Sequence, residues 1–128
     1  MEERTEQQSR KVLVIDDQAP VREAVEEVLA MVGIVVLAAE DGHMGIHMYQ
    51  ERKDEIDLVL LDLSMPGLSG QETLRQLRQI NPAIKVILSS GYSEEEITKE
   101  FDYAKDFLQK PYNIDRLIDL VDQYLSSD

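Results

Sequence analysis

Short apolar runs recur along this chain and alternate with longer segments in which apolar residues follow a helical period. Each run is too short for a stable buried helix. The lack of polar alternation within a run is typical of a strand covered on both faces, as in a parallel sheet. These runs predict five β-strands, at Val12–Ile15, Ile34–Ala38, Leu58–Leu61, Ile84–Leu88 and, shortest, Asp106–Gln109.

Between the strands, apolar residues recur every three or four positions and predict five helices. Gly33 follows the first helix as a C-cap candidate, and Asn81-Pro82 stops the third. Ser93 with Glu96 has the form of a capping box for the fourth. The expected helices run from about Val21 to Val32, Met44 to Arg52, Leu74 to Ile80, Ser93 to Tyr103 and Ile114 to Leu125.

Strict alternation of strands and helices determines the expected architecture. Right-handed crossovers between successive strands give a parallel sheet with helices on both faces. We therefore expect an α/β fold of the flavodoxin-like (βα)5 type, a doubly wound parallel sheet with strand order 2-1-3-4-5. Residues 11–128 are expected to form one domain, and residues 1–10, which lack apolar periodicity, a flexible N-terminal arm or linker.

Charge, apolar run length and the absence of cysteine exclude several classes of partner and chemistry for this chain. The chain has 128 residues, enough for one core, with 26 acidic residues against 13 Lys and Arg and a formal net charge of −13. This charge opposes direct binding to nucleic acid. No apolar run is long enough to span a bilayer and residues 1–10 are polar, so we expect no membrane insertion and a cytoplasmic location. The absence of cysteine excludes thiolate chemistry.

Three carboxylates follow two of the predicted strands. Asp16 and Asp17 follow the first strand and Asp62 follows the third. In the expected strand order these two strands are neighbours, so the three acids should share one pocket at the carboxyl edge of the sheet. Position alone leaves two interpretations of Asp62 open, a functional carboxylate or an Asp that caps the strand or turn.

The chemistry of such a pocket favours a divalent cation. Crowded carboxylates repel one another. Unless one of them stays protonated, Mg²⁺ bound by oxygen ligands is expected to relieve the repulsion, and it leaves a position for a phosphoryl oxygen. Ser90 ends the fourth strand and Lys110 the fifth, so a hydroxyl and an ammonium reach the same edge and can bind phosphoryl oxygens. The remaining role, a nucleophile, falls to a carboxylate that forms an acyl phosphate.

These motifs together resemble the receiver domain of two-component response regulators. Asp16-Asp17 after VLVI is similar to its acidic pair, and Asp62 in LLDLSMPGLSG to its phosphoacceptor; Ser90-Gly91 and Lys110-Pro111 are similar to its remaining two motifs. The resemblance, which covers Lys11 to Leu125, implies that Asp17, Asp62 and the backbone carbonyl of Ser64 ligate Mg²⁺ directly. It also implies that Asp16 acts mainly through water and that the Lys110-Pro111 bond is cis.

The same resemblance implies the partners and the output of the domain. A sensor histidine kinase or a histidine phosphotransfer protein would donate the phosphoryl group, and the chain would catalyse only its own phosphorylation and dephosphorylation. Ser90 and Phe107 would form the switch, although Phe107 lacks the hydroxyl of the Tyr often found there. A homodimer would use the face of the fourth helix, fifth strand and fifth helix. The segments around Ser90 and Lys110 are most similar to hybrid-kinase receivers.

Other functional classes account for the sequence less well. A degenerate receiver that serves only as a binding surface is disfavoured by the intact Asp62, Asp17, Ser90 and Lys110, and a relay receiver without an output switch stays open as the alternative. A flavodoxin-like electron carrier needs a phosphate loop after the first strand, where this chain has Asp16-Asp17, which would repel FMN phosphate. An aspartyl-phosphate hydrolase needs its nucleophile on the first strand, in an Asp-x-Asp pattern that is absent here.

Overall fold

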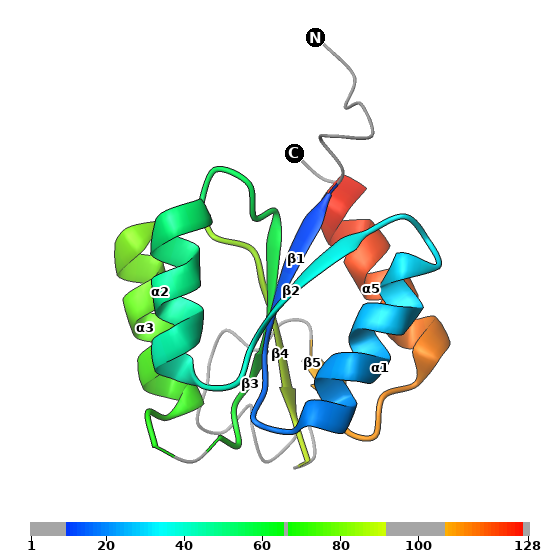
Figure 1. Cartoon of the computed structure of the whole chain (residues 1–128), viewed down its shortest axis with the longest axis horizontal. Helices are drawn as coiled ribbons and strands as arrows, with labels where there is room; N and C mark the ends of the chain where they lie inside the picture. The colour runs from blue at the N-terminus through cyan, green and yellow to red at the C-terminus, as the bar shows by residue number, and fades with distance from the viewer. Residues whose placement is uncertain (1–9, 66, 92–106, 127–128) are drawn as a thin grey trace, which may run out of the picture.

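The computed structural model describes residues 10–65, 67–91 and 107–126, and within them five strands and four helices (Figure 1). The expected helix over residues 93–103 lies outside this part of the chain. In chain order the elements are β1 (Lys11–Ile15), α1 (Ala19–Ala30), β2 (Val35–Ala39), α2 (Gly42–Arg52), β3 (Leu58–Asp62), α3 (Gly70–Ile80), β4 (Val86–Ser90), β5 (Phe107–Gln109) and α5 (Ile114–Ser126).

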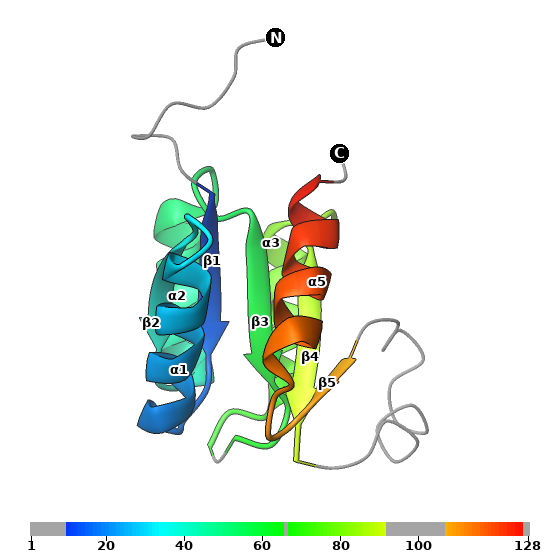
Figure 2. The same cartoon turned by 90° about the vertical axis from the view of Figure 1, so that its right-hand side faces the viewer.

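The strands form one parallel sheet in the order β2-β1-β3-β4-β5, which confirms the predicted topology. Helices α2 and α3 cover one face, and α1 and α5 cover the other (Figures 1 and 2). The carboxyl ends of β1 and β3 therefore lie side by side, at the edge where the predicted site residues gather. Among the described helices none is long and apolar enough to cross a membrane.

Each face of the sheet has its own hydrophobic core, which explains why the strands lack polar alternation. In β1, Leu13 and Ile15 belong to the core under α2 and α3, whereas Val12 and Val14 belong to the core under α1 and α5. Successive side chains of a strand point to opposite faces. Both sets are therefore buried, and a carboxylate, Asp16 after β1 and Asp62 at the end of β3, stands where this double cover stops.

The ends of most elements differ from the predictions by one or two residues, for local reasons, whereas α3 begins at Gly70, four residues before the predicted start at Leu74. Strand β2 begins one residue later than expected because the Ile34 N–H is used at the end of α1, where it donates to Leu29 O at 3.0 Å. Strand β4 begins two residues later because Ile84 N–H closes a turn on Asn81 O at 3.0 Å. Gly33 has a φ of 82°, as its predicted role at the end of α1 requires.

Gly70 brings the start of α3 against the loop that follows β3. A Cβ on this residue would lie 2.5 Å from Leu63 Cα and 2.9 Å from Asp62 O, distances that real Cβ atoms do not adopt. Only glycine allows this approach. Ser69 caps the same helix by accepting a hydrogen bond from Glu72 N–H at 3.1 Å, so the turn after Asp62 is held from both sides.

Candidate functional site

The structure brings the three predicted carboxylates together. Asp16 and Asp62, at the ends of β1 and β3, are each 1% exposed, whereas Asp17 is exposed. One carboxylate oxygen from each of the three lies within 4.8 Å of the others. Asp17 and Asp62 border an open cavity of about 400 Å³, which is lined by Asp17, Gln18, Asp62, Ser64, Gly91 and Lys110.

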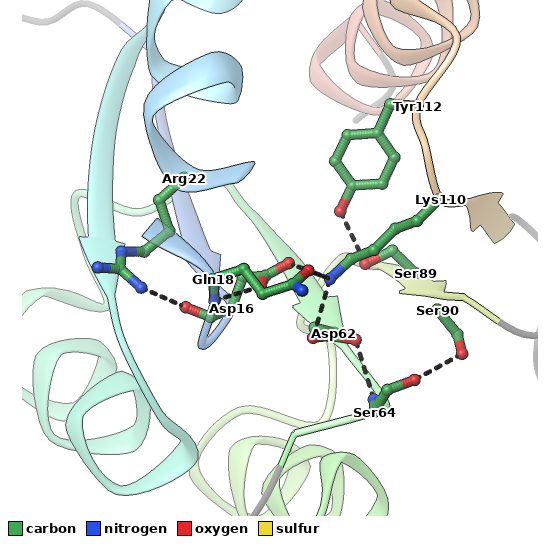
Figure 3. Close-up of polar contacts among 9 residues, drawn as sticks. All are labelled: Asp16, Gln18, Arg22, Asp62, Ser64, Ser89, Ser90, Lys110 and Tyr112. Carbon is green, nitrogen blue, oxygen red and sulfur yellow. Dashed lines mark hydrogen bonds and ion pairs between the residues drawn. The ribbon is translucent and has the colours of Figure 1, made fainter. Parts of the chain in front are cut away.

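Lys110 supplies the positive charge of the site. Its Nζ lies 2.7 Å from Asp16 Oδ2 and 3.1 Å from Asp62 Oδ2, and it donates a hydrogen bond to Gln18 Oε1 at 3.1 Å (Figure 3). The side chain is 14% exposed, so these ion pairs are largely removed from water. The bond from Lys110 to Pro111 is cis, as the family resemblance implies.

Burial and charge shift the pKa of both partners. Burial, the largest influence, and the Asp16 charge raise the pKa of Asp62, while the Ser64 N–H and the Lys110 ammonium lower it. The first two prevail, and the pKa of Asp62 is above its ordinary value. For Lys110, burial is the largest single influence and lowers the pKa, but the two carboxylates together outweigh it and raise the pKa. An ionised Asp62 is therefore costly unless a cation stays close.

The Asp16 carboxylate has one buried oxygen that is suited to a cation. Its Oδ1 accepts a hydrogen bond from Gln18 N–H at 2.9 Å, and its backbone carbonyl accepts one from Arg22 at 2.8 Å. Its buried Oδ2 has no hydrogen-bond partner among the described residues, although the Lys110 ammonium lies 2.7 Å away outside hydrogen-bond geometry. An anionic oxygen in this situation, beside two more carboxylates, fits a hard divalent cation.

Two serines connect the loop after β3 to the end of β4. The Ser64 N–H donates to Asp62 Oδ1 at 2.9 Å, and Ser64 Oγ lies 2.7 Å from Ser90 Oγ (Figure 3). Ser90 is fully buried, whereas Ser64 belongs to the exposed part of the loop. The predicted phosphoryl-binding hydroxyl is thus beside the site and in contact with the Ser64 hydroxyl.

Phe107 lies behind this edge of the sheet. It is 7% exposed, pairs with Leu88 across β4 and β5, and packs in the core under α2 and α3. On the other face of the sheet, β4 is also tied to the loop before α5, because Tyr112 Oη donates to Ser89 Oγ at 2.9 Å. Burial raises the pKa of Tyr112, so this phenol stays protonated and keeps donating.

Sequence reasoning missed two residues that complete the site. Gln18 contacts both Asp16 and Lys110, and Arg22 holds the Asp16 carbonyl. Gln18 immediately follows the acidic pair, which is a usable positional signal. Arg22 carries no such signal, because its contact depends on where the first turn of α1 places a long side chain.

Comparisons with known proteins agree with this geometry. The family model of the response regulator receiver domain matches residues 12–122. Sporulation initiation phosphotransferase F of Bacillus subtilis is 33% identical over 119 residues, which cover 91% of this chain and 94% of the relative.

Two solved structures are similar as well. Response regulator protein TrrA of Thermotoga maritima in complex with Mg²⁺ and BeF has a TM-score of 0.77 at 31% identity, covering 91% of this chain and 99% of the other. A chain in the complex of histidine kinase ThkA with TrrA has a TM-score of 0.80 at 32% identity, with coverage of 91% and 99%.

Proposed function

The chain belongs to the response regulator receiver domain family and acts as a phosphoacceptor in two-component signalling, and from this premise we propose that Asp62 accepts the phosphoryl group. The observation that carries the proposal is the buried Asp62 carboxylate, which borders an open cavity at the end of β3 with the Lys110 ammonium 3.1 Å away. Asp16 has its buried oxygen turned to the same ammonium, and Asp17 is exposed. Asp62 thus combines the position and the neighbours that acyl phosphate formation needs.

The chain's own residues supply most of the chemistry. An Asp62 oxygen forms a bond to phosphorus while the bond from phosphorus to the donor's imidazole nitrogen breaks, and its electron pair returns to the imidazole. Lys110, already beside Asp62, binds a phosphoryl oxygen as negative charge moves onto the group. Ser90 donates to another oxygen after it turns from Ser64. The proposed activity is confined to phosphorylation and dephosphorylation of the chain itself.

The residues present fit Mg²⁺. Asp17 and Asp62 would ligate it directly with the Ser64 carbonyl, and Asp16 would act mainly through water. The bound cation supplies positive charge that lowers the repulsion between the carboxylates and the incoming phosphoryl oxygens. The buried Asp16 Oδ2, which accepts no hydrogen bond from the described residues, supports this assignment. TrrA, one of the similar proteins, was solved with Mg²⁺ and BeF.

The proposed partners are a sensor histidine kinase or a histidine phosphotransfer protein. Support comes from the similarity to TrrA, which was solved bound to the histidine kinase ThkA. We assign the receiver domain to residues 11–128. A homodimer would use β5, α5 and the segment at residues 93–103, which lies outside the described residues.

The proposed switch couples Ser90 to Phe107. When Ser90 turns toward the phosphoryl group, the space that its hydroxyl leaves becomes available to the Phe107 ring. Phe107 has no side-chain hydrogen bond to gain, so its two positions differ by packing alone. A relay domain that passes the group on without this switch is the alternative, and it predicts structural change confined to the loops that touch Asp62.

Labelling with a small phosphodonor tests the assignment of Asp62. With acetyl phosphate and Mg²⁺, we expect intact-mass analysis to show one added phosphoryl group that is labile to hydroxylamine. Asp62→Asn should abolish the addition. Asp54→Asn, which removes an exposed acid far from the cavity, is the matched control and should label like the parent. Undiminished labelling of Asp62→Asn would falsify the proposal.

A further inference from the structure

Helix α2 carries a repeated pair of residues that the proposed function does not use. In the sequence HMGIHM, His43 and Met44 stand four residues before His47 and Met48, and all four belong to α2. Residues three or four apart on a helix are neighbours on its surface. The repeat therefore gathers two imidazoles and two thioethers along the first turns of this helix.

Burial decides which of these side chains a ligand can reach. His43 and His47 are both exposed, and the side chain of His47 is 63% exposed. Met48 is half-buried and packs against the hydrophobic core under α2 and α3. Met44 is instead 45% exposed, so its thioether is available from solvent. Three of the four groups, two imidazoles and one thioether, thus lie on the accessible surface.

The spacing of the three exposed residues lets them share one ion. His47 follows His43 by four residues and Met44 by three, and Cβ atoms at these spacings lie about 5 to 6 Å apart on a helix. A pair of histidines four residues apart on one face is a known arrangement for a metal ion. The Met44 sulfur lies next to this pair as a third ligand.

The opposite side of the helix holds the backbone of these residues in place. A Cβ on Gly45 would lie 2.4 Å from Ile15 Cδ1, so α2 packs directly on β1. Asp41 caps the helix by accepting a hydrogen bond from Met44 N–H at 2.8 Å. A backbone that is already ordered lowers the entropy cost of bringing the ligands together.

The imidazoles are free to bind an ion, and their surroundings favour a cation. Within the part of the chain that the structure describes, His43 makes no hydrogen bond or ion pair. His47 Nε2 lies 3.3 Å from Glu51 Oε1, which leaves Nδ1 for an ion. Histidines that bind metals usually have a carboxylate at the other ring nitrogen, which orients the ring. The net charge of −13 attracts cations in general.

We propose that His43, Met44 and His47 bind a soft monovalent cation of the copper(I) class. Soft thioether ligands favour Cu(I), and imidazole also suits copper. The carboxylate pocket at Asp62 has the opposite preference, because hard oxygen ligands suit Mg²⁺. The chain therefore separates two kinds of metal ion between two surfaces, and the site on α2 does not depend on phosphorylation.

Titration with Ag⁺, a redox-inert ion with the charge and softness of Cu(I), tests the site. We would follow the amide resonances of the full chain at saturating Mg²⁺, which occupies the carboxylate pocket, and expect shifts centred on residues 42–52. Loss of an outer partner of a metal ligand typically costs about 10- to 100-fold in affinity, so loss of a ligand should cost at least about tenfold. We expect this weakening for each of three variants, His43→Gln, His47→Gln and Met44→Leu.

Met31→Leu is the matched control. Met31 is 84% exposed and lies at the end of α1, outside the proposed site, so this variant should bind Ag⁺ like the parent. The substituted side chains are all exposed, and circular dichroism should show each variant folded.

Three results would overturn the inference. The first is the absence of Ag⁺-induced shifts in α2. The second is equal affinity of Met44→Leu and the parent, because the thioether would then not be a ligand. The third is a loss in Met31→Leu as large as in Met44→Leu, which would show binding to any exposed thioether. Labelling by acetyl phosphate should be unchanged in all four variants, so a failure of this site is distinguishable from a failure of the proposed function.

Discussion

Replacing Lys110 with Met tests how the site is held together before any phosphoryl group binds. The Lys110 ammonium lies 2.7 Å from Asp16 Oδ2 and 3.1 Å from Asp62 Oδ2, and both carboxylates are 1% exposed. Met has a similar length and fills the same space without the charge. The substitution therefore leaves two buried carboxylates beside each other with no cation when Mg²⁺ is absent.

The expected loss of stability is large. Removing one member of a buried ion pair typically costs about 3 to 5 kcal/mol, and the slight exposure of Lys110 places this case at about 3 kcal/mol. For a chain of 128 residues, an unfolding entropy of about 2.1 cal/mol/K per residue converts this into a fall in Tm of about 11 °C. Lys53→Met, which removes the same charge from an exposed position, should change stability by less than about 0.5 kcal/mol.

Acid and Mg²⁺ should both reduce the loss. The pKa of Asp62 is already raised, and removal of Lys110 raises it further, so Asp62 becomes neutral as the pH falls and the uncompensated charge disappears. The deficit of Lys110→Met is then greatest at neutral pH and shrinks as the pH falls through the folded-state pKa. In the parent, where the pKa of Lys110 is raised, the stabilisation from Lys110 is complete below its ordinary pKa and is lost as the pH rises through the folded value.

Urea unfolding followed by circular dichroism, with a chelator and then with Mg²⁺, measures these effects. We expect Lys110→Met to unfold at much lower urea than Lys53→Met with the chelator, and to gain more than the parent from Mg²⁺. Equal midpoints for the two variants in the chelator would refute the reasoning, because the buried carboxylates would then not depend on Lys110.

Two further predictions test the neighbouring geometry. Gly70→Ala should destabilise the fold by about 1 to 3 kcal/mol in urea unfolding, because its Cβ would lie 2.5 Å from Leu63 Cα. Gly91→Ala, whose Cβ would have no atom of the described residues within 4 Å, should be nearly neutral. Asp17→Asn should weaken Mg²⁺ binding and slow phosphorylation by acetyl phosphate, yet raise the Tm of the metal-free protein by relieving repulsion among the three carboxylates; a lower metal-free Tm would contradict their sharing one pocket.

Alternation of short apolar runs with helical segments was sufficient to predict the sheet order and the meeting of Asp16, Asp62 and Lys110. Those residues follow strands, and parallel strands end at one edge of the sheet. The start of α2 was predicted at Met44 but lies at Gly42. Gly42 and Gly45 are both buried. Because glycine has no apolar side chain, the apolar periodicity of the sequence could not reveal that the first turn of α2 has a buried face.

Other features of the site depend on the direction in which side chains point and could not be predicted from the sequence. The adjacent acids Asp16 and Asp17 look alike in the chain, yet one is buried and the other exposed, because neighbouring side chains at a strand end point to different sides. The hydrogen bond between Ser64 and Ser90 joins residues 26 positions apart and depends on rotamers within a loop.

Direct identification of the modified residue tests the central claim. After treatment with acetyl phosphate and Mg²⁺, borohydride reduction converts an aspartyl phosphate into homoserine, and tandem mass spectrometry of the peptides then locates it. The account predicts homoserine at position 62, with Asp16 and Asp17 unchanged. Homoserine at either of those two positions, or at no position in a chain that has gained a phosphoryl group, would contradict it.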